Sequence, residues 1–87
     1  GLIYQTRGDL DQAEKMHRKS LAIEEKLGRL EGMAIQYGNL GTVYEQRGDV
    51  ATAREYWTKA RDLFEQIGIP HEVEKVQAWL DELEDEG

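Results

Sequence analysis

The sequence predicts an all-α fold: an antiparallel array of paired helices, an α-solenoid, ending in a C-terminal capping helix. Three observations support this prediction. Apolar residues recur at helical spacing along most of the 87 residues. The tripeptide Arg-Gly-Asp occurs at 7–9 and again at 47–49, and Gly28 returns as Gly68, so the chain repeats itself at an offset of 40 residues. Self-similarity at such a period is typical of helical repeat proteins.

Composition narrows the possible classes of function. Charged residues make up 33% and apolar residues 39%, which is enough to fold one small domain. The formal net charge is −7. We therefore expect no nucleic acid and no anionic membrane as a partner, because both attract Lys and Arg, and we expect a basic or neutral protein instead. No apolar run approaches the roughly 18 to 20 residues of a membrane span.

The chain contains no cysteine. This excludes disulfides, thiolate metal sites and a cysteine nucleophile. It is also compatible with the cytoplasmic location that we expect.

Residues 1–28 are interpreted as a truncated first repeat. Residues 1–7 correspond to 41–47, the second half of a helix, whereas a counterpart of 34–40 is missing in front of them. We therefore expect the chain to be a fragment of a longer array.

A helix is expected to follow a turn at Gly8-Asp9 and to run to about Leu27. Glycine tolerates the positive φ of such a turn, and Asp9 with Gln12 fits a capping box. Gly28 is expected to end the helix. Its predicted inner face consists of Leu10, Ala13, Met16, His17, Ser20, Leu21, Ile23 and Leu27.

Residues 31–68 are interpreted as a complete repeat, with helices at 31–47 and 50–67. A glycine inside a helix costs roughly 1 kcal/mol relative to alanine. Gly41 therefore indicates that the second helix approaches closely, where Ala53 and Ala60 are also small. The predicted contact faces are Ala34, Tyr37, Leu40, Gly41 and Tyr44 in the first helix, and Val50, Ala53, Tyr56, Trp57, Ala60, Leu63, Phe64 and Ile67 in the second.

Residues 70–84 are interpreted as a capping helix that begins at a proline, which suits a first helical turn. With a loop one residue shorter, its apolar face overlays that of 31–47. Leu80 then stands where the earlier helix has Gly41, so no further helix needs to pack there. Trp79, like Trp57, falls at a position expected in the core. The overlaid face consists of Val73, Val76, Leu80 and Leu83.

These residues resemble the tetratricopeptide repeat (TPR). The family's pattern of aromatic, Leu-Gly, Tyr, Gly, Ala, aromatic and Ala is filled by Tyr37, Leu40, Gly41, Tyr44, Gly48, Ala53, Trp57 and Ala60. The first copy departs from it at His17 and Ser20. The period of 40 exceeds the usual 34 and is similar to the longer subclass seen in kinesin light chains and in Leu-Gly-Asn-repeat scaffolds. The resemblance covers about residues 1–68 and specifies a fold more than a partner.

The resemblance implies a non-catalytic scaffold whose concave face binds a peptide or protein segment. The implied groove residues are Gln5, Thr6, Ile35, Asn39, Thr42 and Gln46. Asn39 matches a family position whose amide often binds a peptide backbone, since an amide both donates and accepts. The alternative is a solvated polar face. Thr42 and Gln46 stand where family members that grip a carboxylate need cations, so no such clamp is expected.

We expect no cofactor, no metal site and no catalytic set. His17 lacks a second ligand at metal spacing and is interpreted as an interface histidine, whereas His71 is expected to face solvent. The carboxylates at 24–25 and 81–86 are interpreted as solvated charges, because acid–base chemistry needs groups held in a positioned site. An enzyme with an unrecognised site is a remaining alternative.

The second hypothesis is self-association as a homodimer or a higher assembly. A stable stack normally needs about three repeats, and the helix at 10–27 lacks cover on one side. A second copy, docked at the N-terminal end or exchanging helices, would supply that cover. Apolar Leu2 and Ile3 at this end favour the hypothesis.

Overall fold

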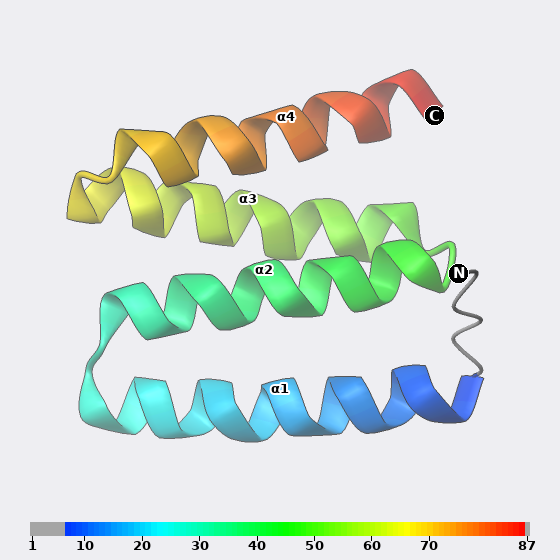
Figure 1. Ribbon diagram of the computed structural model, residues 1–87, viewed down its shortest axis with the longest axis horizontal. Helices are drawn as coiled ribbons and strands as arrows, with labels where there is room; N and C mark the ends of the chain where they lie inside the picture. The colour runs from blue at the N-terminus through cyan, green and yellow to red at the C-terminus, as the bar shows by residue number, and fades with distance from the viewer. Residues whose placement is uncertain (1–6, 87) are drawn as a thin grey trace.

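In the computed structural model, which describes residues 7–86, four helices lie side by side in chain order, each antiparallel to the one before (Figure 1). They are α1 (Arg7–Leu27), α2 (Leu30–Gln46), α3 (Val50–Ile67) and α4 (Pro70–Glu86). Each helix packs on its neighbours in the sequence. The predicted all-α array is thereby confirmed, and no strand occurs in the described part of the chain.

The three connections between helices each contain a glycine in the left-handed region. The φ angles are 70° at Gly28, 85° at Gly48 and 86° at Gly68. Residues with a Cβ rarely adopt this conformation, so glycine lets each helix end sharply and the chain reverse. At the third connection, the amides of Gly68 and Ile69 both donate to the carbonyl oxygen of Phe64 at 3.0 Å.

The predicted turn at Gly8-Asp9 is wrong, and so is the capping box from Asp9 to Gln12. Both residues of the pair lie within the first turn of α1. At Gly48 the packing of α2 on α3 imposes a reversal. At Gly8, in contrast, the backbone is already helical from Arg7 onwards and continues so to Leu27. Asp9 is an acidic residue in the first turn of α1, where a negative charge interacts favourably with the positive end of the helix dipole.

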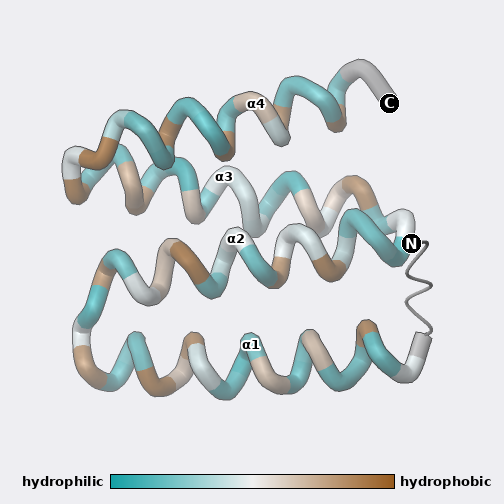
Figure 2. Tube along the Cα trace, in the orientation of Figure 1, coloured by the Kyte–Doolittle hydropathy of each residue, from teal (hydrophilic) through white to brown (hydrophobic). Residues whose placement is uncertain are grey.

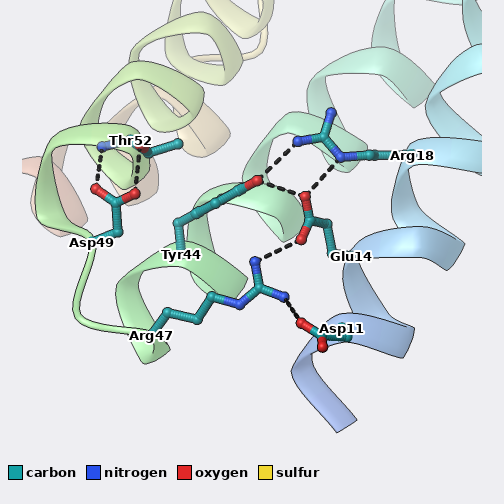
Figure 3. A network of polar contacts seen from close by, with 7 residues as sticks. All are labelled: Asp11, Glu14, Arg18, Tyr44, Arg47, Asp49 and Thr52. Carbon is teal, nitrogen blue, oxygen red and sulfur yellow. Dashed lines mark hydrogen bonds and ion pairs between the residues drawn. The ribbon is translucent and has the colours of Figure 1, made fainter. Parts of the chain in front are cut away.

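The second Gly-Asp pair does form the expected cap. One carboxylate oxygen of Asp49 accepts a hydrogen bond from the backbone amide of Thr52 at 3.2 Å, and the other accepts from the Thr52 hydroxyl at 2.7 Å (Figure 3). Asp49 therefore satisfies one of the amides that a helix start leaves without an intrahelical partner.

The main hydrophobic cluster joins α2, α3 and α4. Its buried members are Ala34, Ala53, Trp57, Ala60, Phe64, Val76, Leu80 and Leu83. The apolar face predicted for the capping helix is confirmed by this cluster, and so is the core position of Trp57. Trp79 is only partly buried and packs against the cluster from one side. The described part of α1 contributes no residue to it.

Gly41 allows the close approach between helices that its position predicts. A Cβ added there would lie 2.3 Å from Cδ1 of Trp57, far inside van der Waals contact. The side chain that needs the space is thus the indole of Trp57, rather than Ala53 or Ala60, which are nevertheless fully buried.

A polar network attaches α1 to α2 (Figure 3). The carboxylate of Glu14 accepts hydrogen bonds from the Tyr44 hydroxyl, from Arg18 Nε at 2.8 Å and from Arg47 at 2.6 Å. Arg47 also pairs with Asp11. The hydrogen bond from Tyr44 is the largest cause that lowers the pKa of Glu14 to about 2; burial opposes it, and the two arginines add to it.

His17 lies in the same interface, where its Nδ1 is 3.1 Å from Oε1 of Gln36. Leu40 and Val43 are buried outside the main cluster, four and seven residues after Gln36 and therefore on the same side of α2. Figure 2 shows how hydrophilic and hydrophobic residues alternate along α1. The α1–α2 interface is therefore mixed, whereas the α2–α4 unit has an apolar core.

Candidate functional site

One concave feature of the molecule is a groove whose walls are α2 and α4 and whose floor is α3. We call it the α2–α4 groove. The small or apolar residues Ala34, Gly38, Ile69, Val76 and Leu83 contribute to its lining. The larger side chains of the lining are Glu31, Ile35, Asn39, Thr42 and Glu45 from α2, Glu72, Lys75, Trp79 and Glu82 from α4, and Trp57 and Phe64 from α3.

Helical spacing explains why each wall is a single stripe. The larger lining residues of α2 and of α4 follow one another at steps of three or four residues, which places them on one face of each helix. Because α3 is antiparallel to both, α2 and α4 run in the same direction (Figure 1). On the floor, the buried rings of Trp57 and Phe64 lie two turns apart along α3.

Three hollows follow one another along the α2–α4 groove. The first, of about 300 Å³, lies beside Thr42 and Trp79. The second, of about 90 Å³, shares Trp79 with the first. The third, of about 460 Å³, shares Ile35 and Lys75 with the second. The shared residues show that the three hollows adjoin one another, and we refer to them together as the channel.

Three of the six sequence-predicted groove residues line this channel. Ile35 is 45% exposed, and Asn39 and Thr42 are half-buried. Gln46 is exposed at the end of α2 and lines none of the three hollows. Gln5 and Thr6 lie outside the described residues. Whether any of the six contacts a peptide stays a prediction.

The polar groups of the α2 wall are partly engaged. Asn39 Nδ2 donates to Oε1 of Gln36 over a long 3.4 Å, and the Thr42 hydroxyl donates to the carbonyl oxygen of Gly38 at 3.1 Å. Within the described residues, the side-chain oxygen of Asn39 takes part in no hydrogen bond. Asn39 and Thr42 therefore offer two oxygen acceptors and one weakly engaged amide donor.

The α4 wall is the part that the sequence reading missed. It treated residues 70–84 as a cap and assigned Trp79 to the core. In the structure the Trp79 ring lies 5.3 Å from that of Trp57, tilted by 44°, and lines two of the hollows. The signal was the spacing of Glu72, Lys75, Trp79 and Glu82, which puts all four on one helical face.

No group of three or more His, Asp or Glu side chains that could hold a metal ion occurs among the described residues. The one carboxyl with a pKa near 2, Glu14, belongs to the α1–α2 network and not to the groove. In the same part of the chain, no helix combines the length and hydropathy needed to cross a membrane.

A family model described as "Tetratricopeptide repeat" matches residues 1–66 of the 87. Neither the comparison with curated proteins nor that with solved structures gave a match.

Proposed function

The chain belongs to the tetratricopeptide repeat family, and on that premise we propose that it is a non-catalytic scaffold that binds a peptide or protein segment in the α2–α4 groove. Members of this family generally mediate protein–protein interaction. The observation that carries the proposal is the alignment of Ile35, Asn39 and Thr42 opposite Trp79 along one channel. An apolar floor with a few polar groups on its walls is the usual composition of a binding site.

Selection of short random peptides against the chain tests this proposal. We expect the selected peptides to bind the double variant Ile35→Ala/Asn39→Ala about tenfold more weakly, because both an apolar contact and an amide are lost. The matched control is Ile23→Ala/Gln12→Ala, which removes an isoleucine and a side-chain amide from exposed positions of α1. Equal affinity of the groove variant and the wild type would rule out the groove as the binding site.

We also propose that the repeat belongs to the longer, 40-residue subclass. Gly28 and Gly68, 40 residues apart, end α1 and α3 with similar φ angles of 70° and 86°. A crystal structure tests this: residues 10–27 should superpose on residues 50–67 one for one, and a shifted offset would contradict the subclass.

Self-association through α1 is a second candidate function. Met16, Ile23 and Leu27 form a narrow stripe on α1 with exposed fractions of 62%, 57% and 56%. Their counterparts 40 residues later, at 56, 63 and 67, are half-buried. A second copy would supply the missing cover. Sedimentation across a concentration series should then show a dimer that Ile23→Glu dissociates, whereas a wild-type monomer at every concentration would exclude this candidate.

The negative charge leads us to propose protein partners rather than nucleic acid or membranes. Retention on immobilised DNA or on anionic vesicles at physiological salt would contradict this.

A further inference from the structure

The α2–α4 groove is negatively charged, and one end of it holds a cation of the chain itself. Among its described lining residues are four carboxylates, at 31, 45, 72 and 82, and one ammonium, that of Lys75. Lys75 Nζ lies 3.2 Å from Oε2 of Glu72 and 5.5 Å from the centroid of the Trp79 ring. At this end, a carboxylate and an indole together accommodate a lysine head group.

The other end of the groove offers the same two kinds of group without a cation. Its hollow of about 300 Å³ is lined by Thr42, Glu45, Trp57, Trp79, Glu82 and Leu83, with no Lys or Arg among them. Within the described residues, neither Glu45 nor Glu82 makes an ion pair or a side-chain hydrogen bond. Two uncompensated carboxylates beside an aromatic ring attract a positive charge.

We propose that this end, the Glu45–Glu82 pocket, receives a Lys or Arg side chain of the bound peptide. The inference rests on the proposed function and adds that the partner is a cationic segment. The aliphatic part of the side chain lies against Trp79, as long basic side chains do on apolar surfaces, while its head group reaches the carboxylates. A Glu or Asp at the same place is rejected, because no lining cation offsets the repulsion.

The peptides selected from the random library are the probe. We expect a Lys or Arg at one position, whose replacement by Gln weakens binding by about tenfold. The variant Glu45→Gln/Glu82→Gln should weaken the original peptide by a similar factor and leave the Gln peptide nearly unaffected, which shows that the two changes remove one interaction. Circular dichroism confirms that the variant is folded.

The matched control is Glu55→Gln/Glu84→Gln, which removes the same charge from exposed positions outside the groove. It should change the affinity less than about twofold. An equal loss with this control would mean that only the net charge attracts the peptide, and would overturn the pocket.

The remaining outcomes separate this inference from the proposed function. Selected peptides that lack Lys and Arg but lose affinity with Ile35→Ala/Asn39→Ala overturn the cationic pocket and leave the groove in place. Peptides that are insensitive to both the pocket variant and Ile35→Ala/Asn39→Ala overturn the groove and the pocket together.

Discussion

The indole nitrogen of Trp57 donates a hydrogen bond to the backbone oxygen of Gly38, 3.0 Å away on the neighbouring helix. The same ring lies against Gly41, one turn further along α2. The bond satisfies a buried donor that would otherwise be costly. Gly38 and Gly41, one turn apart, thus form the surface of α2 against which the Trp57 ring packs. This contact sets how closely α2 and α3 approach.

Replacing Gly41 with Ala should destabilise the fold by up to about 2 kcal/mol. Its Cβ would lie 2.3 Å from Cδ1 and 2.4 Å from Nε1 of Trp57, and the hydrogen bond to Gly38 keeps the ring from moving away. Overpacking costs about 1 to 3 kcal/mol, of which the better helix propensity of alanine returns about 1 kcal/mol. Urea unfolding followed by circular dichroism measures the difference.

Gly38→Ala is the matched control for this substitution. A Cβ at Gly38 has only Cζ3 of Trp79 nearby, at an ordinary 3.9 Å. The variant should therefore be as stable as the wild type, or more stable by up to about 1 kcal/mol. Equal stability of the two variants would show that Trp57 does not limit the space at Gly41.

Tyr44→Phe should cost about 1 to 2 kcal/mol, since it removes the hydroxyl that donates to Glu14 and accepts from Arg18 at 2.8 Å. The ring can still stack on Tyr56, whose centroid is 5.6 Å away. Tyr56→Phe is the control: the Tyr56 hydroxyl has no hydrogen bond within the described residues, so its loss should cost less than about 0.5 kcal/mol. If Tyr44→Phe unfolds at the same urea concentration as the wild type, the network does not contribute to the stability of the fold.

The stabilisation from Glu14 should disappear in acid. Its pKa in the folded chain is about 2, below the ordinary value of 4.5. A depressed pKa means that the unfolded chain takes up the proton first. The contribution is therefore complete above about pH 4.5 and is lost as the pH falls towards 2.

Glu14→Gln isolates that contribution. At pH 7 the variant should be less stable than the wild type by on the order of 2 kcal/mol, a figure reduced for the partial solvent exposure of the network. The difference should shrink to near zero at about pH 2. Glu25→Gln, at an exposed position of the same helix, should show little difference at pH 7. A Glu14→Gln deficit that persists unchanged into acid would refute the assigned pKa.

Asp49→Ala should destabilise the chain by about 1 kcal/mol, because α3 loses the cap on the Thr52 amide. Asp49→Asn keeps an oxygen acceptor and should recover most of the loss. Thermal unfolding of the three chains checks this. If Asn is no better than Ala, the carboxylate acts through its charge at the helix start and not as a cap.

Features governed by neighbouring residues could be predicted from the sequence. Gly28, Gly48 and Gly68 end helices because glycine readily adopts a positive φ, and a glycine is visible in the sequence itself. The apolar face of α4 follows from its spacing alone. At Gly8 the same local signal failed: the identical Gly-Asp pair lies within the first turn of α1 and does not end a helix.

The α4 wall of the groove and the Glu14 network depend on distant residues. Glu14 meets Tyr44 across 30 positions of the chain, and no local pattern marks either residue as half of a contact. Trp79 has the spacing of a core residue, and only the placement of α4 beside α2 leaves part of its ring uncovered. The α2 wall could therefore be predicted from the sequence, whereas the α4 wall could be recognised only from the way the helices pack.

The division between a mixed, partly charged α1–α2 interface and an apolar α2–α4 core has a consequence for the order of unfolding. Charged hydrogen bonds at a surface weaken with salt, whereas buried apolar contacts do not. We expect α1 to detach as a separate cooperative unit of lower stability, so that its amides exchange with deuterium before those of α3, and earlier still as salt is added. Uniform exchange across both helices would contradict this. Since the groove lies entirely within the more stable unit, a bound peptide should protect α2 to α4 and leave the exchange of α1 unchanged.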